Sequence, residues 1–451
     1  MTSLLQGYYL KMKEEKDNPI TPFAIADWRG KGTVFGIKRK DRSGHVYIIG
    51  KTGTGKSTLI QNMLLSDILQ GNGFAIIDPH GDLAEEVLNF IPKGRIQDVI
   101  YFNPADAEYP IAFNPLEKVN PERYHLVVSG LISVFKKIWP EFWGPRLEHI
   151  LRHSILTLLE YPGSSLLDLP RLLTDKDFRA EVLKHVRNQH IRDFWFNEFE
   201  KYSAWLRSEA VSPILNKVGQ FLTSAPLRNI VGQRENTFNL RNVMDEGKIL
   251  IINLAKGKIG EDNTALLGAM LVTKIQLAAL SRADISEESR KPFYLFVDEF
   301  HNFLTLSFAD ILSEARKYGL NVTLAHQYIE QLEDKMRAAV FGNVGTIISF
   351  RVGAEDAKYL AREFHPVFSE ADIINLPNHH IYLKLMIDGL SSKPFSAVTL
   401  PAYKHEACPT NGIIEASRRK YGSASKEVER EMAYKSFTQE RERDSQGSLF
   451  G

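Results

Sequence analysis

The chain has 451 residues, about three times the length of a typical domain, so we expect more than one folded unit. Its 43% hydrophobic and 25% charged residues form the ordinary globular mixture and exclude a disordered or fibrous protein. Basic and acidic residues number 56 and 55, so binding to nucleic acid would have to depend on local charge. The single cysteine, Cys408, excludes an intramolecular disulfide and a cysteine-based zinc site, and it fits a reducing compartment.

We predict neither an export signal nor a membrane-spanning segment. Residues 1–16 lack the charged start, apolar run and small-residue cleavage site of a secretory signal. The most apolar long stretch, residues 264–280, is interrupted by Lys274 and Gln276 and is shorter than the run of about 18 uncharged residues that marks a spanning helix. We therefore expect a cytoplasmic protein, peripheral at the inner face of the cell membrane only through partners.

Short β-branched runs alternate with helical stretches along much of the chain, which predicts a parallel sheet covered by helices. A helix is predicted at residues 56–69, between the first two strands, and another at residues 263–281. From about residue 124 to residue 240 the strands disappear and long helical patterns take over, such as residues 146–160 and 178–198. The strands are predicted at residues 46–50, 74–78, 99–102, 249–253, 294–299, 321–325, 346–350, 381–385 and 395–398.

This order predicts an α/β domain with a mainly parallel sheet, interrupted by an inserted all-α domain. The predicted boundaries are an N-terminal extension 1–40, a nucleotide-binding domain 41–120 and 241–405, an all-α insertion 121–240, and a charged C-terminal helix and tail 406–451. Residues 171–234 hold 11 Lys and Arg against 7 Asp and Glu, with Trp195 and Trp205 among them. A solvated helical surface explains each charge singly; as a group, the charges fit a DNA-facing subdomain.

A phosphate-binding loop follows the first predicted strand. The residues Gly50, Lys51, Thr52, Gly53, Thr54, Gly55, Lys56 and Ser57, followed by Thr58, match the pattern at every fixed position. Their amides would point at the β-phosphate, Lys56 would contact the β and γ oxygens, and Ser57 would hold Mg²⁺. We therefore predict ATP and Mg²⁺ as cofactors.

Polar residues end two later strands. Asp298 is predicted to complete the Mg²⁺ shell with Ser57, and Glu299 to act as the base that polarises the attacking water. An isolated Asp-Glu pair at a strand end would be unremarkable as a helix cap, but the phosphate loop upstream favours catalysis. Gln327 would sense the γ-phosphate, although a solvated turn is the alternative for a glutamine in this position.

An arginine acting on a neighbouring subunit has two candidates. Arg316 lies on a predicted helical segment, residues 314–319, and Arg351 ends the strand 346–350. Either could reach a γ-phosphate in trans, and a surface salt bridge explains either one equally well.

Two further features have simpler explanations. The Asp-Pro-His-Gly-Asp sequence at residues 78–82 would either line the nucleotide site or reverse the chain. We interpret His149, His153, His379 and His380 as structural, because the helix that holds the first pair lacks the glutamate of a zinc-protease motif.

Several segments together carry a resemblance to a known family. They are residues 44–57, 76–82, the Phe-Trp-Gly-Pro-Arg sequence at 142–146, residues 250–254, 297–299 and 325–327. On these residues the chain resembles the conjugative coupling ATPases of type IV secretion systems, the TraG/TraD-like group, within the FtsK and HerA class of RecA-like P-loop DNA motors. The resemblance runs from about residue 37 to residue 400.

The resemblance implies a RecA-like fold and a homo-hexameric ring that uses ATP hydrolysis to move DNA, single- or double-stranded, through a central channel. It also implies a relaxase and secretion channel components as partners. Coupling proteins of this group usually carry N-terminal membrane helices, and HerA-like motors an N-terminal β-barrel; residues 1–40 indicate neither.

We therefore weigh three functions. The first is a Mg-ATP-driven DNA translocase of the coupling-protein type, with Lys56, Gln327 and Arg316 assisting the base Glu299. The second is a HerA-like translocase or helicase that works with a nuclease in repair or defence. The third, of another class, is an adaptor ATPase whose helical insertion recruits protein substrates to a secretion system.

Overall fold

The computed structural model describes residues 19–27, 32–117, 119–305, 308–309, 312–403 and 410–433. The chain divides into two compact units. We call the first the sheet unit; it comprises Met1–Phe102, Leu240–Gly257 and Leu271–Ala416. We call the second the helical unit; it comprises Asn103–Asn239, Lys258–Met270 and Ser417–Gly451. The end of the predicted C-terminal tail, from residue 434, lies outside the described residues.

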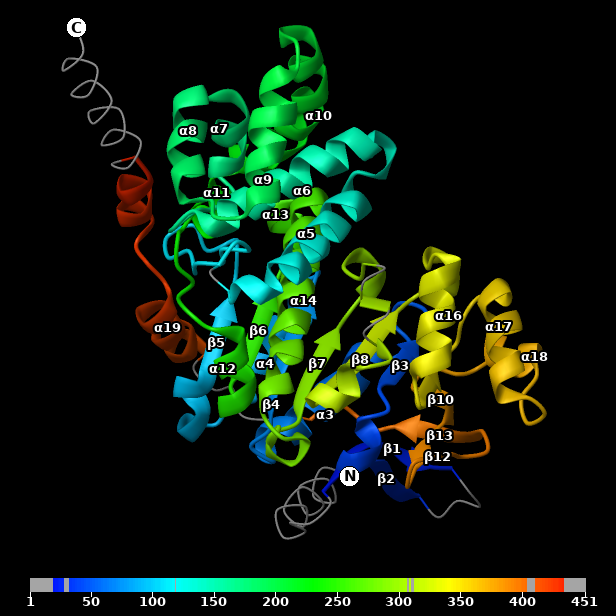
Figure 1. The fold of residues 1–451 in the computed structure, drawn as a ribbon. Helices are drawn as coiled ribbons and strands as arrows, with labels where there is room; N and C mark the ends of the chain where they lie inside the picture. The colour runs from blue at the N-terminus through cyan, green and yellow to red at the C-terminus, as the bar shows by residue number, and fades with distance from the viewer. Residues whose placement is uncertain are drawn as a thin grey trace, which may run out of the picture. The chain divides into compact units, whose positions relative to one another are not determined.

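The sheet unit is built on an 11-stranded sheet in the order β2-β1-β13-β10-β9-β3-β8-β7-β4-β6-β5 (Figure 1). The seven strands from β9 to β5 are all parallel to their neighbours. The predicted α/β class with a mainly parallel sheet is therefore confirmed. The strands are β1 (Ile20–Ala26), β2 (Thr33–Lys38), β3 (Val46–Ile49), β4 (Gly73–Asp78), β5 (Val99–Phe102), β6 (Ile249–Asn253), β7 (Phe293–Val297), β8 (Leu320–His326), β9 (Thr346–Ser349), β10 (His380–Lys384) and β13 (Phe395–Thr399), and a separate hairpin pairs β11 (Met386–Ile387) with β12 (Leu390–Ser391).

The other four strands extend the sheet antiparallel at one side. Two of them, β1 and β2, lie within the predicted N-terminal extension, where the sequence indicated no element. Pro22 lies inside β1 at a break in its register with β2, and proline normally argues against an interior strand. On β2, a Cβ added to Gly36 would lie 1.9 Å from the Thr21 carbonyl oxygen, so only glycine permits this close approach of the two strands.

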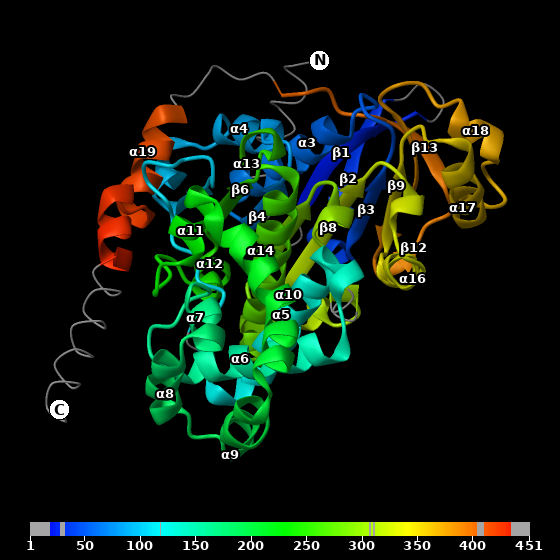
Figure 2. The ribbon, with the colours of Figure 1, turned by 90° about the horizontal axis from the view of Figure 1, so that it is seen from above.

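Helices cover both faces of the parallel strands. In Figures 1 and 2, α3 (Lys56–Leu69) and α4 (Asp82–Leu88) lie on one face and α14 (Glu261–Ser281) on the other. The parallel strands β3, β5, β6 and β7 are buried along their whole length and apolar except for Asn253 at the end of β6, as a sheet covered on both faces requires. The other helices that belong wholly or partly to this unit are α2 (Arg39–Arg42), α12 (Leu240–Glu246), α13 (Lys256–Ile259), α16 (Asp334–Asn343), α17 (Ala354–Phe364), α18 (Glu370–Ile374) and α19 (Thr410–Tyr421).

A buried ion pair fixes α2 against α3 in the sheet unit. Arg42 donates to both carboxylate oxygens of Asp67, at 2.6 and 2.9 Å, and its guanidinium lies 3.6 Å from the centre of the Tyr294 ring. Both side chains of the ion pair are almost completely buried. Removing either partner would leave the other charge buried without its counterion.

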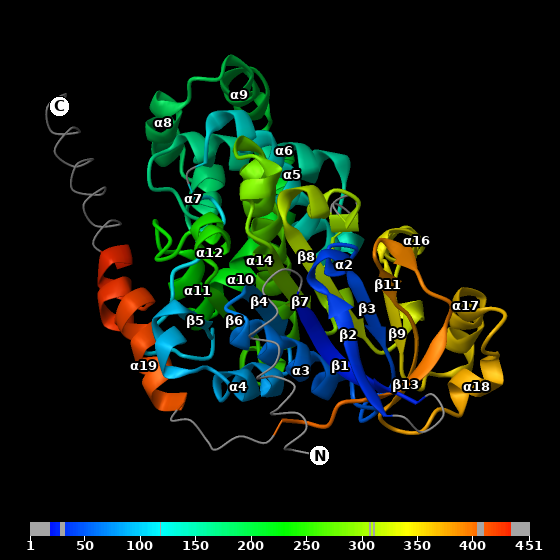
Figure 3. The same cartoon turned by 90° about the horizontal axis from the view of Figure 1, so that it is seen from below.

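The described part of the helical unit contains helices and no named strand. The prediction of one continuous helix at residues 178–198 is wrong. The chain leaves the helix at Val186, and Asn188 begins α9 with its side chain accepting from the His190 amide. The helices are α5 (Tyr124–Ile138), α6 (Pro145–Glu160), α7 (Asp168–Thr174), α8 (Lys176–His185), α9 (Gln189–Asp193), α10 (Ala204–Thr223) and α11 (Ala225–Val231), visible in green and cyan in Figure 3.

One helix among the described residues is long and apolar enough to cross a membrane by length and composition alone. It runs over Glu261–Asp284, and 72% of its most apolar window is buried inside the protein. Core helices of soluble proteins pass the same test. The prediction that the sequence has no membrane-spanning segment therefore stays a prediction.

Candidate nucleotide-binding site

The predicted phosphate loop connects β3 to α3 and ends at the first turn of that helix. Gly53 and Gly55 have φ of 76° and 119°, values that favour glycine, and they allow the backbone to curl. The loop leaves Thr52, Gly53 and Ser57 exposed, whereas Thr54 is buried. Backbone amides at the start of α3 are thus available to an anion, as in other helices that begin with a glycine-rich loop.

Lys56 is buried at the start of α3, and its ammonium is held by the loop itself. Its Nζ donates to the Gly50 carbonyl at 2.6 Å and to the Lys51 carbonyl at 3.3 Å. Burial lowers the pKa of Lys56, while Glu299 and Asp298 oppose that shift. The lysine therefore lies within electrostatic reach of both predicted catalytic carboxylates.

Asp298 directly follows the last residue of β7, at the same edge of the sheet as the phosphate loop. Its amide donates to the Ile77 carbonyl at 3.1 Å, which keeps it beside the end of β4. Burial raises the pKa of Asp298 to about 7, and the charges of Glu299 and Asp78 add to the shift while Lys56 opposes it. A cation at this position would relieve the repulsion among the three carboxylates.

Glu299 is buried and has φ of 43°, a left-handed conformation that few non-glycine residues adopt. Gln327, at the end of the neighbouring strand β8, donates through Nε2 to Glu299 Oε1 at 2.8 Å. On the other side, His301 Nδ1 lies 3.6 Å from Glu299 Oε2. The structure thus brings Lys56, Asp298, Glu299 and Gln327 together at the carboxyl edge of the parallel strands, where α/β proteins bind ligands.

The two candidate trans arginines lie at opposite edges of the sheet. Arg316 is exposed on a 3₁₀ turn, Ala315–Tyr318, that leads into the amino end of β8. Arg351 follows β9 at the carboxyl edge, where its carbonyl accepts from the Lys51 amide at 2.9 Å and its guanidinium donates to Asn378 Oδ1 at 2.9 Å. Arg316 is therefore remote from this chain's own phosphate loop, and Arg351 is beside it.

The turn at residues 78–82 has a clear structural role. Asp78 accepts from the His80 amide at 2.8 Å and from the Ala84 amide at 2.9 Å, so it caps the start of α4. Gly81 has φ of 96°, and a Cβ there would lie 2.8 Å from Asn253 Oδ1. Because Asp78 also acts on the pKa of Asp298, the same turn borders the candidate site.

His379 was predicted to be structural, and it supports the phosphate loop directly. Its amide donates to the Thr54 carbonyl at 2.9 Å, and a Cβ added to Gly55 would lie 2.9 Å from its Nδ1. His301, adjacent to Glu299, was not singled out from the sequence at all. Neither residue belongs to a recognised motif: His301 lies in the 3₁₀ turn Phe300–Asn302 that directly follows Glu299, whereas His379 reaches the loop from a distant part of the chain. The histidine pair His149 and His153 forms no metal site with other described residues.

Comparison with known proteins defines the family. A sequence model described as "Type IV secretion-system coupling protein DNA-binding domain" matches residues 31–365. The chain belongs to this coupling-protein family. The match covers the phosphate loop, all of the helical stretch between β5 and β6, and both Asp298 and Glu299. The predicted family resemblance is confirmed.

A curated relative and solved structures agree with this family. The chain is 22% identical over 385 residues to the type 4 coupling protein DotL of Legionella pneumophila; the match covers 69% of this chain and 48% of DotL, so the chain spans about half of that relative's length. The conjugative coupling protein TrwBdeltaN70 has a TM-score of 0.59 at 19% identity, covering 89% of this chain and 94% of TrwBdeltaN70. VirB4 of Thermoanaerobacter pseudethanolicus has a TM-score of 0.54 at 13% identity, covering 88% and 98%. These similarities show a shared RecA-like fold.

Proposed function

We propose that this protein is an ATP-hydrolysing motor that moves DNA, of the type that couples DNA transfer to a type IV secretion system. The observation that carries the proposal is the convergence of Lys56, Asp298, Glu299 and Gln327 beside the phosphate loop of a coupling-protein family member. Structures of TrwB in complex with an ATP analogue and with ADP and Mg²⁺ support the choice of cofactors. ATP and Mg²⁺ are thus the proposed cofactors here.

In the proposed mechanism, residues 50–58 would hold the phosphates, and Lys56 would leave the loop carbonyls to contact the β and γ oxygens. Ser57 and Asp298 would hold Mg²⁺, which supplies charge neutralisation at the phosphates. Glu299, fixed by the hydrogen bond from Gln327, would take the proton of the attacking water. Gln327 would then report the loss of the γ-phosphate to β8 through the same contact.

We further propose a homo-hexameric ring around DNA, with a relaxase and secretion channel components as partners and a location at the inner face of the membrane. The all-α insertion at residues 121–240 would form a domain of its own, and residues 406–451 a charged C-terminal helix and tail, as the sequence predicts. In such a ring one subunit's Arg316 would contact its neighbour's γ-phosphate. Its exposure at the edge remote from its own loop favours it over Arg351 for a role in trans.

The test of the proposed function is ATP hydrolysis by the purified chain with and without DNA. At low salt, where phosphate contacts are strongest, either single-stranded or duplex DNA should raise the steady-state rate. Lys56→Ala protein, purified in parallel, controls for contaminating ATPases. A rate that stays the same with both DNA forms would refute the DNA motor and favour the adaptor alternative.

A mixing experiment tests the arginine in trans. Arg316→Ala subunits and Lys56→Ala subunits should each be inactive alone and should regain part of the activity when mixed, because some interfaces then hold an intact pair. The same experiment with Arg351→Ala is the control. Recovery with Arg351→Ala but not with Arg316→Ala would reverse the assignment.

A further inference from the structure

The Phe-Trp-Gly-Pro-Arg sequence at residues 142–146 has no part in the nucleotide site. It lies in the helical unit and links α5 to α6, with Gly144 extended and Pro145 in the first turn of α6. Trp143 lines two separate depressions in the surface of this unit. One depression is lined mainly by charged and polar side chains and the other mainly by apolar ones, and this difference indicates what kind of ligand each could hold.

The first depression is an open cleft of about 510 Å³, a size in the range of small-ligand sites. Its lining includes Lys136, Trp143, Gly144, Glu148, His149 and Arg152. Lys136 is exposed, and Arg152 lies on the same helix as Glu148. A lysine and an arginine side chain therefore line the same cleft as one aromatic ring.

Among the described residues that line this cleft, Glu148 is the single acid, and its carboxylate is already engaged. Glu148 accepts from Trp143 Nε1 at 2.8 Å and from the Arg152 guanidinium at 3.0 Å. The hydrogen bond from Trp143 is the largest cause of the lowered pKa of Glu148, so this carboxylate is ionised at neutral pH. Glu148 thereby orients the indole ring and the guanidinium in the same cleft.

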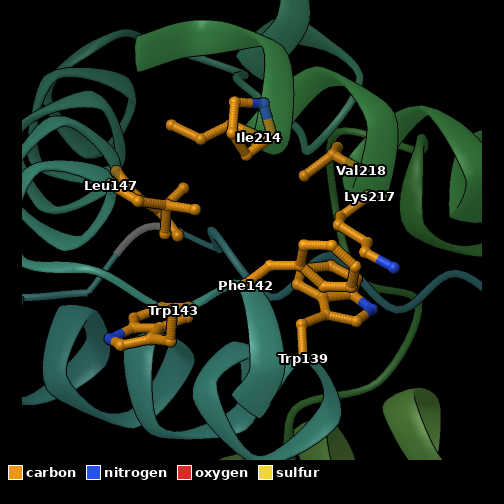
Figure 4. Close-up of a pocket in the computed structure, with 9 residues that line it drawn as sticks. Trp139, Phe142, Trp143, Leu147, Ile214, Lys217 and Val218 are labelled. Atoms are coloured by element: carbon orange, nitrogen blue, oxygen red, sulfur yellow. The ribbon is translucent and has the colours of Figure 1, made fainter. Parts of the chain in front are cut away.

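The second depression is an apolar recess of about 10 Å³, the room of about one water molecule. Figure 4 shows Trp139, Phe142 and Trp143 grouped on one side of it and Ile214 on the other. Phe142 is 56% exposed, and the Lys217 ammonium lies 4.3 Å from the centre of its ring. The recess is too small for the apolar side chain of a docked peptide, so the open cleft is the better candidate for a ligand.

We propose that the cleft at residues 136–152 binds single-stranded DNA, with a base stacked on Trp143 and backbone phosphates paired with Lys136 and Arg152. This inference rests on the proposed function and specifies the DNA form that the helical unit recognises. An aromatic ring flanked by cations is the arrangement that holds unpaired bases without sequence preference. In a duplex the faces of the bases are covered by their neighbours, so only the phosphate contacts would remain.

The test is the binding of a fluorescein-labelled 30-nucleotide oligothymidylate to the full chain, measured by anisotropy beside a 30-base-pair duplex. Trp143→Ala should weaken oligothymidylate binding about 5-fold or more and change duplex binding less than about 2-fold. Tyr109→Ala is the control, because that aromatic side chain is 39% exposed in the helical unit and does not line the cleft. Equal affinity of the folded Trp143→Ala and wild-type proteins for the oligothymidylate would overturn the proposal.

Two further variants separate stacking from structural support. Trp143→Phe loses the hydrogen bond to Glu148 but keeps an aromatic ring on which a base can stack. Its affinity for the oligothymidylate should therefore stay close to that of the wild-type protein. A loss of affinity as large as that of Trp143→Ala would overturn base stacking. Lys136→Ala should reduce the slope of log affinity against log salt by about 0.7, and the control Lys358→Ala, which removes an exposed lysine paired with Glu355, should not. An unchanged slope in Lys136→Ala would overturn the phosphate contact.

The same measurement distinguishes this proposal from the motor function. Wild-type protein that binds duplex DNA, with no effect of the Trp143 variants on either DNA form, would refute the cleft and leave the motor intact. Wild-type protein that binds neither DNA form at low salt would refute both.

Discussion

The candidate sites of the two units differ in where their charged side chains lie. In the sheet unit, Lys56, Glu299 and the ion pair of Arg42 with Asp67 are buried and held by named hydrogen bonds. In the helical unit, Lys136 is exposed, and exposed aromatic rings lie near cations, as Phe142 does with Lys217. Charges fixed inside a protein are preorganised for chemistry on a small ligand, whereas charges at a surface suit a long polyanion. Under the proposed function, hydrolysis therefore belongs to the sheet unit and recognition of DNA to the helical unit.

The largest effect should come from Lys56→Ala. This change removes the cation of the phosphate loop, so nucleotide binding should fall below detection and hydrolysis should drop on the order of 10²-fold or more. Binding of a fluorescent ATP analogue and steady-state phosphate release measure the two effects. If the division between the units holds, oligothymidylate binding without nucleotide should stay at the wild-type level; its loss would show that the sheet unit also carries the DNA site.

Glu299→Gln should separate nucleotide binding from hydrolysis. The amide keeps the size of the side chain but cannot accept the water's proton, so hydrolysis should fall about 10²-fold while ATP binding changes little. Glu314→Gln, a change at an exposed residue near the opposite edge of the sheet, is the matched control. Normal turnover in Glu299→Gln protein would mean that another group is the base.

Asp67→Ala should destabilise the sheet unit strongly. Arg42 would remain buried without its counterion, which costs about 3–5 kcal/mol of unfolding free energy. Urea unfolding measures the loss, and Asp388→Asn, which removes one charge of the exposed pair with Lys38 and tolerates the φ of 52° at this position, should shift the unfolding midpoint little. Similar shifts of the unfolding midpoint in both variants would show that the buried ion pair stabilises the protein no more than the exposed pair does.

His45 should make the sheet unit sensitive to acid. Its Nε2 donates to the Leu312 carbonyl at 3.0 Å, its Nδ1 accepts from the Val322 amide at 3.1 Å, and burial lowers its pKa to about 4. The unfolded chain binds a proton near pH 6.5 and the folded chain near pH 4. Stability is therefore complete above pH 6.5 and falls with pH toward 4, by about 2 kcal/mol at pH 5.

The variant His45→Asn isolates this contribution, because asparagine tolerates the φ of 62° at this position and does not titrate. Its unfolding free energy should change less between pH 8 and pH 5 than that of wild-type protein. The same pH dependence in both proteins would assign the acid sensitivity to other groups.

Much of the sheet unit was predictable, because parallel strands buried on both faces are continuous apolar runs that end in polar residues. The strands β3, β5 and β6 and helix α3 lie within one residue of their predicted bounds. The antiparallel strands β1 and β2 were missed because Pro22 and Gly36 interrupt the patterns that mark a strand.

The candidate site was predictable only for those residues that lie together in one short sequence motif. The phosphate loop and the Asp298–Glu299 pair follow from local sequence, whereas the hydrogen bond of Gln327 to Glu299 depends on β7 and β8 being neighbours. His379 reaches Thr54 from a distant part of the chain, and no spacing along the sequence indicates that contact. In the helical unit, the break between α8 and α9 depends on one asparagine cap within an otherwise helical pattern.

The most direct test of the central claim is movement along DNA. In a streptavidin-displacement assay, wild-type protein with ATP and Mg²⁺ should release streptavidin from end-biotinylated single-stranded or duplex DNA. Release should stop with a non-hydrolysable ATP analogue and in Glu299→Gln protein, while DNA binding persists. Absence of displacement from both DNA forms by protein that hydrolyses ATP, or displacement that does not require ATP, would contradict a motor driven by the sheet unit.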